Sequence, residues 1–222
     1  MELNKYIDHT KLGAYCTEES IVQLCKEAKE YKFKSVCINP CFIPLAKQEL
    51  EGSDVLVCTV IGFPHGATTT ETKVFETKDA IKKGADEIDM VINVSDLKNG
   101  HKDRVLKEIK KIKKACGERV LKVIIETALL TKEEIKLASK LVVRAKANFV
   151  KTSTGFAEYG ARFEDVALMV KTVKGAAEVK ASGGVKNKLD AEKMIELGAT
   201  RIGTSKGLLI VKGEEGDSNS AY

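Results

Sequence analysis

The sequence lacks any apolar run long enough to cross a bilayer, and it lacks the charged start and apolar stretch of a signal peptide. We therefore expect neither a membrane protein nor an exported one, and the cytoplasm is the expected compartment. Basic residues are not interleaved with aromatic ones, which make up only 5% of the chain, so no nucleic-acid partner is expected. No linker rich in proline, glycine and serine interrupts the chain, which indicates one domain.

Metal-binding and disulfide patterns are also missing. The cysteines are scattered and form no C-x-x-C pair, and no second cysteine or histidine pair completes a zinc pattern with Cys37 and Cys41. His9, His65 and His101 fall in three separate segments. We predict no metal site and buried free thiols, as in a reducing compartment. The cysteines are Cys16, Cys25, Cys37, Cys41, Cys58 and Cys116.

The composition is that of an ordinary globular protein. Hydrophobic residues make up 43% and charged residues 31% of 222 residues, which suffices for one substantial core. The formal net charge is +5, with lysine and glutamate interleaved along most helical stretches. This mixture is typical of solvated helix surfaces, and a field that attracts anionic substrates is the less favoured interpretation.

Short runs rich in β-branched residues alternate with helical patterns along the chain. The expected strands are Tyr6–Thr10, Ser35–Asn39, Val55–Phe63, Glu87–Asn93, Val120–Thr127, Asn148–Thr152, Glu178–Ser182 and Thr200–Thr204. Thr17 is expected to cap the first helix, and Thr131 with Glu134 forms a capping box before another. Glycines stand where helices should end, at Gly84, Gly117, Gly175 and Gly198. Strands separated by helices of this length require a parallel sheet.

Such strands either close into a barrel or form an open doubly wound sheet. We favour the barrel because several strands end in charged residues, among them Asp89, Lys151 and Lys180, and a barrel gathers those ends at one mouth. The predicted fold is therefore α/β, a single-domain (β/α)8 TIM barrel over residues 1–212. Residues 213–222 are polar and rich in glycine and serine, and we expect a mobile tail there.

Lys151, Lys180 and Asp89 stand inside strands where a packed apolar interior would reject a charge. Each lysine precedes a glycine-containing loop, and the aspartate makes two buried ammonium groups tolerable. Burial and a neighbouring cation both lower a lysine pKa from its usual ~10.4, which leaves more neutral amine for attack on a carbonyl. The resulting iminium ion drives cleavage of a neighbouring carbon–carbon bond without metal or cofactor, and a carboxylate–ammonium pair relays the protons.

Two glycine-rich segments, Ser182–Val185 and Gly203–Gly207, follow the last two expected strands. In (β/α)8 barrels these loops often bind phosphate through backbone N–H groups, and glycine lets the anion approach the backbone closely. Two turns without a ligand are the alternative. The occurrence of both loops in the expected places favours phosphate.

Seven motifs together resemble those of the deoxyribose-phosphate aldolase family. They are Ile7–Thr10, Ser35–Pro40, Phe63–Gly66, Glu87–Asn93, Lys122–Thr127, Val150–Gly155 and Val179–Gly184. The match runs in order from about Ile7 to Gly207, nearly the whole chain. The resemblance implies a class I aldolase, free of cofactor, that reversibly splits 2-deoxy-D-ribose 5-phosphate into D-glyceraldehyde 3-phosphate and acetaldehyde in deoxyribose phosphate catabolism.

The resemblance also implies a role for each candidate residue. Lys151 is the Schiff-base nucleophile, and Lys180 lowers its pKa and shares a proton relay with Asp89. The phosphate-binding positions are Gly155, Gly183, Gly184, Thr204 and Ser205, and the pocket residues are Asp8, Thr10 and Cys37. The segment Phe156–Gly160 lacks the lysine that some relatives place there for phosphate. A homodimer or higher homo-oligomer is a further expectation.

Three other residues receive a structural interpretation. Lys122 and Glu126 share one parity in an expected strand, so we predict a polar pair inside the barrel rather than a catalytic role. For Tyr222, a disordered terminus is favoured over a tail that brings its phenol to the proton relay. Two other functions stay open at this point: another lysine-dependent barrel enzyme, such as a transaldolase or class I dehydratase, and a non-catalytic binder of phosphate ligands.

Overall fold

Eight strands follow one another around a closed ring in the computed structural model, which describes residues 2–214. Neighbouring strands are parallel, and the pairing of the last strand with the first, with Asp8 opposite Gly203, closes the ring. The strands are β1 Ile7–Lys11, β2 Ser35–Ile38, β3 Leu56–Ile61, β4 Glu87–Val91, β5 Val120–Ile124, β6 Phe149–Lys151, β7 Glu178–Ser182 and β8 Arg201–Thr204. This closure confirms the (β/α)8 barrel and excludes the open sheet.

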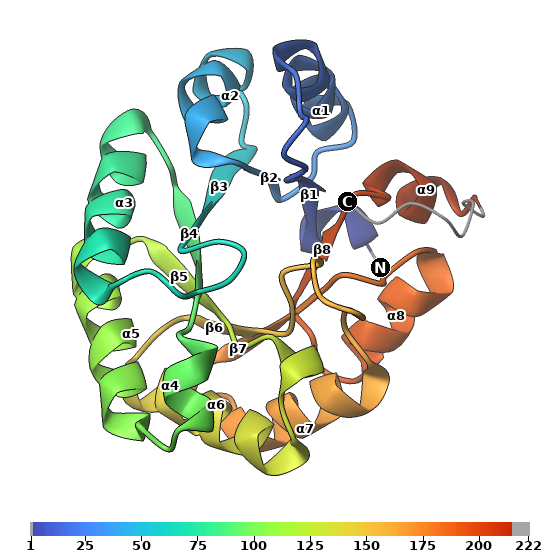
Figure 1. Ribbon diagram of the computed structural model, residues 1–222. Helices are drawn as coiled ribbons and strands as arrows, with labels where there is room; N and C mark the ends of the chain where they lie inside the picture. Colours follow the sequence, from blue (N-terminus) through green and yellow to red (C-terminus); the bar gives the residue numbers. More distant parts are fainter. Residues whose placement is uncertain (1, 215–222) are drawn as a thin grey trace.

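Helices cover the outside of the barrel on all sides (Figure 1). The α-helices are α1 Glu18–Glu30, α2 Ile43–Glu49, α3 Thr70–Lys83, α4 Val94–Lys98, α5 Lys102–Cys116, α6 Lys132–Arg144, α7 Phe163–Val173, α8 Lys188–Glu196 and α9 Gly207–Lys212. Short 3-10 turns lie at Leu3–Tyr6 (η1), Pro40–Phe42 (η2) and Thr127–Leu129 (η3). Within residues 2–214, no helix is both long and apolar enough to cross a membrane.

The predicted helix ends are confirmed by hydrogen bonds. The Thr17 side chain accepts from the backbone N–H of Ser20 at 3.3 Å. The Thr131 side chain accepts from Glu134 N at 3.3 Å, and the Glu134 carboxylate accepts from Thr131 N at 2.7 Å, which completes the capping box. Gly84 and Gly117 follow α3 and α5 directly, whereas Gly175 and Gly198 follow α7 and α8 one residue later.

The expected strand Val120–Thr127 is longer than the observed strand β5. β5 ends at Ile124, because Glu126 adopts a left-handed backbone conformation with a φ of 55° and opens the turn η3. Such a φ is uncommon in a residue with a side chain, and a run of apolar residues does not predict it. The period-two alternation of a strand therefore does not extend to Glu126.

The two faces of the strands carry different residues. Side chains that point outward are apolar, such as Ile88 and Met90 of β4, and they pack with the helices in one large hydrophobic cluster. Side chains of the opposite parity point into the barrel and include buried charges such as Glu87 and Asp89. The barrel interior thus holds the polar residues in a closed space.

Of the predicted tail, residues 215–222, which include Tyr222, lie outside the described residues. The division of the chain into a barrel over 1–212 and a mobile tail therefore stays a prediction.

Candidate active site

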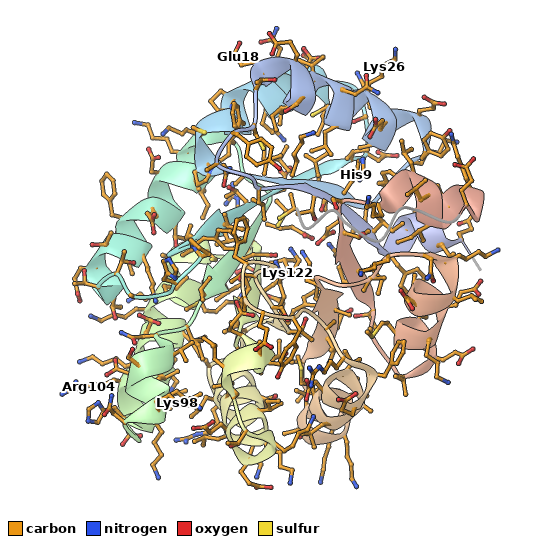
Figure 2. All side chains as sticks on the ribbon, turned by 45° about the vertical axis from the view of Figure 1, so that its right-hand side comes forward. His9, Glu18, Lys26, Lys98, Arg104 and Lys122 are labelled. Carbon is orange, nitrogen blue, oxygen red and sulfur yellow. The ribbon has the colours of Figure 1, made fainter. Side chains whose placement is uncertain are left out.

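Asp89 of β4 lies at the centre of the barrel interior and contacts three lysines from three other strands. Its Oδ2 accepts from Lys151 Nζ at 2.8 Å and from Lys180 Nζ at 2.9 Å. Its Oδ1 accepts from Lys122 Nζ at 2.9 Å. Figure 2 shows Lys122 in the middle of the barrel. The structure thus brings together the three residues predicted as a catalytic group and adds a fourth, Lys122.

A second layer of charges lies deeper in the barrel, around Asp8. One oxygen of Asp8 accepts from Lys180 Nζ at 2.5 Å, and the other accepts from Arg201 Nη1 at 2.8 Å and from Ser35 Oγ at 2.7 Å. Glu87 accepts from Arg201 at 2.8 Å and lies 2.6 Å from Lys122 Nζ. Each ammonium and carboxylate of the two layers therefore touches at least one opposite charge.

This pairing holds Asp89, Lys122 and Lys180 in their charged forms. Burial alone would raise the pKa of Asp89, but Lys122, Lys151 and Lys180 hold that pKa well below its usual range. Burial would lower the pKa of Lys180, yet the carboxylates of Asp8 and Asp89 raise it above its usual value. The pKa of Lys122 is raised in the same way, chiefly by Asp89 against the effect of burial. Lys122 and Lys180 are therefore fixed cations.

Glu87 and Arg201 were not singled out from the sequence as site residues. Arg201 is 6% exposed and its guanidinium lies over the ring of Phe149, 5.3 Å from the centroid. Glu87 precedes Asp89 by two residues, so both share the inward parity of β4. Charged residues at inward positions of apolar strands were the signal that could have found them, because the same signal identified Asp89.

The predicted pair between Lys122 and Glu126 is wrong. Lys122 contacts Asp89 and Glu87, whereas the Glu126 carboxylate accepts from Thr154 N at 3.2 Å and from the Thr154 hydroxyl. The parity behind the prediction fails because β5 ends before Glu126. Burial raises the pKa of Glu126 against the effect of the hydrogen bonds from Thr154. These hydrogen bonds link the loop after β6 to the turn after β5.

Two buried thiols border the lysine cluster. Cys37 of β2 and Cys58 of β3 are register partners on adjacent parallel strands, and both are fully buried. Cys58 Sγ lies 3.2 Å from Asp89 Oδ1 and 3.3 Å from Lys122 Nζ. Thr10, the other predicted pocket residue besides Asp8 and Cys37, is buried and donates its hydroxyl to the backbone oxygen of Asp8 at 2.8 Å.

The residues predicted to bind phosphate lie on three adjacent loops. Gly155 after β6 and Gly183 after β7 have left-handed φ angles of 89° and 73°, and a Cβ on Gly183 would come 3.4 Å from the Cα of Gly155. A Cβ on Gly160 would meet the backbone of Gly183 at 2.2 Å, which no side chain permits. The Ala161 backbone N–H donates to the Gly183 oxygen at 2.8 Å and fixes this approach.

The third loop joins this group through Thr204 of β8. Its hydroxyl donates to the backbone oxygen of Val185 at 2.9 Å and accepts from Lys206 N at 3.0 Å. The Thr204 side chain therefore links the loops after β7 and β8. The neighbouring Ser205 is exposed, as is Gly184 in the loop after β7.

Comparisons with known proteins agree with this arrangement. A family model described as DeoC/LacD family aldolase matches residues 3–212. The chain belongs to this aldolase family. It is an enzyme of the lyase class, and the function is that of an aldolase. The barrel that carries the lysine cluster and the three glycine loops is thus an aldolase barrel.

Individual relatives match this aldolase over their whole length. Deoxyribose-phosphate aldolase of Streptococcus gordonii is 56% identical over 219 residues, which are 99% of this chain and 100% of the relative. Deoxyribose-phosphate aldolase of Bacillus cereus is 56% identical over 223 residues, with 100% of both chains covered. Among solved structures, a deoxyribose phosphate aldolase from Aeropyrum pernix, described as tetrameric, superposes with a TM-score of 0.87 at 32% identity, covering 95% of this chain and 89% of that one.

Proposed function

We propose that this aldolase reversibly cleaves 2-deoxy-D-ribose 5-phosphate to D-glyceraldehyde 3-phosphate and acetaldehyde through a Schiff base on Lys151. The observation that carries the proposal is that Lys151 and Lys180 share one carboxylate oxygen, Asp89 Oδ2, inside the barrel. The names of the relatives supply the substrate. Two amines on one carboxylate supply the chemistry, since a lysine beside a fixed cation is the usual device for a nucleophilic amine.

The balance of charge in the network supports Lys151 as the reacting amine. Among the described residues, the network contains four basic groups, Lys122, Lys151, Lys180 and Arg201, and three carboxylates, Asp8, Glu87 and Asp89. A buried excess charge is costly, so the network favours one uncharged basic group. Arginine does not give up its proton, and carboxylates hold Lys122 and Lys180 protonated. Lys151 remains.

In the proposed cleavage, the neutral amine of Lys151 attacks the aldehyde carbon of the open-chain sugar. The carbinolamine takes up a proton and loses water, which leaves an iminium ion beside C2. The C2–C3 bond then breaks: its electrons move into the iminium to give an enamine, and the C3 hydroxyl loses its proton to form glyceraldehyde 3-phosphate. Protonation of the enamine carbon and hydrolysis release acetaldehyde and regenerate Lys151.

Asp89 and Lys180 are the proposed proton carriers for these steps. Lys180 lies between Asp8 and Asp89, within 2.5 and 2.9 Å of their oxygens, so a proton given to the reaction can be restored from within the network. Asp89 also fixes Lys151 in place by a direct hydrogen bond. Both groups act by general acid–base chemistry and by orientation.

The three glycine loops are the proposed phosphate site. Gly155, Gly183 and Gly184 have no side chain that would cover their backbone N–H groups. Thr204 ends β8, and Ser205 begins the loop that follows it. In (β/α)8 barrels this position after the seventh and eighth strands commonly holds phosphate. Thr10 and Cys37 complete the proposed pocket beside Asp8. Breakdown of deoxyribose phosphates in the cytoplasm, by a homo-oligomer, is the proposed setting; the relative from Aeropyrum pernix is described as tetrameric.

Reductive trapping tests the nucleophile directly. The full chain is mixed with acetaldehyde and borohydride, digested and mapped by mass spectrometry, and we expect an ethyl group on Lys151. Lys151→Ala should abolish trapping and lower turnover by about four orders of magnitude or more, because it removes the covalent route. Lys140→Ala, a matched change at an exposed lysine on α6, should leave both unchanged. Trapping on another lysine, or turnover retained by Lys151→Ala, would refute the assignment.

A further inference from the structure

The two thiols beside Asp89 take no chemical step in the proposed cleavage, although Cys37 lines the proposed pocket and both are buried. Cys37 and Cys58 face each other across adjacent parallel strands, and their Sγ atoms lie within 4.8 Å of each other and of an Asp89 oxygen. Neighbouring strands are separated by about 4.8 Å, which falls inside the Cα separation of roughly 4.4–6.8 Å that a disulfide requires. The spacing of the two strands is therefore compatible with a disulfide between these register partners.

A metal ion is a poor occupant of this group. Cys58 Sγ lies 3.3 Å from the ammonium of Lys122, and Asp89 already accepts hydrogen bonds from three lysines. A divalent cation held by Cys37, Cys58 and Asp89 would lie among fixed positive charges, which repel it strongly at low dielectric. A disulfide is neutral and meets no such repulsion.

We propose that Cys37 and Cys58 form a reversible redox pair, which a peroxide converts from dithiol to disulfide and which thereby turns the aldolase off. The effect on activity rests on the proposed function, because the disulfide would act through Asp89. The bond itself does not depend on that function. In proteins of reducing compartments, disulfides of this kind are typically transient and serve as sensors.

The neighbouring charges give the two sulfurs different reactivity. The hydrogen bond with Cys58 lowers the pKa of Cys37 against the effect of burial, and the ammonium of Lys180 lowers it further. Burial and the hydrogen bond with Cys37 raise the pKa of Cys58 well above its usual value. Cys37 is therefore the thiol that peroxide oxidises first, and Cys58 is the resolving thiol.

Both steps balance. Cys37 attacks hydrogen peroxide and becomes a sulfenic acid, with release of one water: Cys37–SH + H2O2 gives Cys37–SOH + H2O. The sulfur of Cys58 then attacks the sulfenic sulfur, the S–OH bond breaks, and the departing hydroxyl leaves with the thiol proton as a second water. Two electrons pass from the two sulfurs to the peroxide. A dithiol reductant reverses the change by exchange.

Disulfide formation changes the surroundings of the catalytic carboxylate. The disulfide removes the thiol hydrogen that Cys58 donates to Asp89 Oδ1, 3.2 Å away in the dithiol form. Asp89 loses a hydrogen-bond donor on the oxygen that also binds Lys122. We expect turnover to fall by about tenfold or more, because a displacement of about 1 Å at a reacting group has effects of this order.

The test uses the full chain in a Cys41→Ser background. Trypsin leaves Cys37 and Cys41 together in the peptide 35–47, whereas Cys58 is the lone cysteine of the peptide 48–73. Cys41 is exposed, whereas the lysine cluster is buried, so Cys41→Ser should retain activity. The chain is treated with hydrogen peroxide, quenched with catalase, denatured with N-ethylmaleimide, and digested. We expect linked peptides 35–47 and 48–73, and recovery of activity with dithiothreitol.

Cys58→Ser in the same background is the matched control. Its hydroxyl keeps a donor beside Asp89 but cannot form the link. Excess peroxide should then oxidise the Cys37 sulfenic acid further to a sulfinic acid, with release of a second water, and dithiothreitol does not reduce a sulfinic acid. Cys58→Ala serves if the serine variant does not fold. The proposal is overturned if the linked peptides are absent, if they form without loss of turnover, or if the control recovers as fully as its parent. Peptide masses detect the disulfide whether or not borohydride trapping identifies Lys151 as the nucleophile. Failure of this proposal can therefore be distinguished from failure of the proposed function.

Discussion

The inward and outward faces of the same strands are built by opposite rules. In β4, Ile88 and Met90 point outward into the helix layer and lie within the large apolar cluster. Glu87 and Asp89, on alternate positions of the same strand, point inward. Within residues 2–214, their side chains form hydrogen bonds with charged groups and with a thiol. One strand thus supports both the hydrophobic shell and the charged interior, because its side chains alternate.

This difference separates stability from chemistry. Outward residues act through apolar burial, which tolerates changes of shape at a modest cost. Inward residues act as a network in which each charge compensates another, so the loss of one member leaves its partners buried and unpaired. We therefore expect neighbouring positions on β4 to respond very differently to small substitutions.

Asp89→Asn should have the largest effect, in comparison with Ile88→Val next to it. The amide removes the charge that three lysines share, so we expect the free energy of unfolding to fall by about 3–5 kcal/mol and turnover to fall by orders of magnitude. Ile88→Val removes one methylene from the outer layer and should cost about 0.5–1.5 kcal/mol with turnover nearly unchanged. Urea denaturation and steady-state cleavage rates measure both. Equal losses in the two variants would mean that the faces do not differ as we describe.

Lys180→Leu should shift the pH dependence of adduct formation. Lys180 is the cation that shares Asp89 Oδ2 with Lys151, and its removal makes a neutral amine at position 151 less favoured. We expect the midpoint for borohydride trapping with acetaldehyde to move up by about one pH unit or more. Lys180→Arg keeps the positive charge and should leave the midpoint near that of the parent chain. A midpoint unmoved in the leucine variant, once circular dichroism shows it folded, would remove Lys180 from this role.

The sequence was enough to predict the fold and the central cluster, for physical reasons that particular residues show. Strands alternating with capped helices leave few topologies, and charges at Asp89, Lys151 and Lys180 distinguish a closed polar interior from an ordinary core. The partners of those charges were harder to predict. Arg201 and Glu87 come from strands β8 and β4, and pairing across the barrel depends on strand register, which no local pattern contains.

Glu126 shows the other limit. Its pairing was predicted from strand alternation, and that alternation ended two residues earlier at a left-handed turn. The stability of such a turn depends on contacts made after folding, here those of the carboxylate with Thr154. Local sequence contains no record of that partner, which lies 28 positions away.

The smallest predicted effect concerns the Glu126 carboxylate, which lies just beyond the end of β5. Burial raises the pKa of Glu126 in the folded chain, so the folded state holds its proton more tightly than the unfolded state does. Stability from this group is therefore present at pH values below the unfolded pKa of about 4.3 and is lost as the pH rises through the raised folded value. Glu126→Gln keeps an oxygen acceptor for Thr154 and does not ionise. Relative to the parent chain, it should gain stability between pH 4 and pH 7, by no more than about 1 kcal/mol.

Glu133→Gln is the matched control, because a hydrogen bond from Lys136 lowers the pKa of that exposed carboxyl. The difference in the free energy of unfolding between Glu133→Gln and the parent chain should have the opposite sign over the same pH range. Urea denaturation of the three chains at both pH values measures the two differences. If Glu126→Gln instead lost stability toward neutral pH, as Glu133→Gln does, the hydrogen bonds from Thr154 would stabilise the Glu126 carboxylate more than burial destabilises it. Glu126 would then resemble the compensated charges inside the barrel.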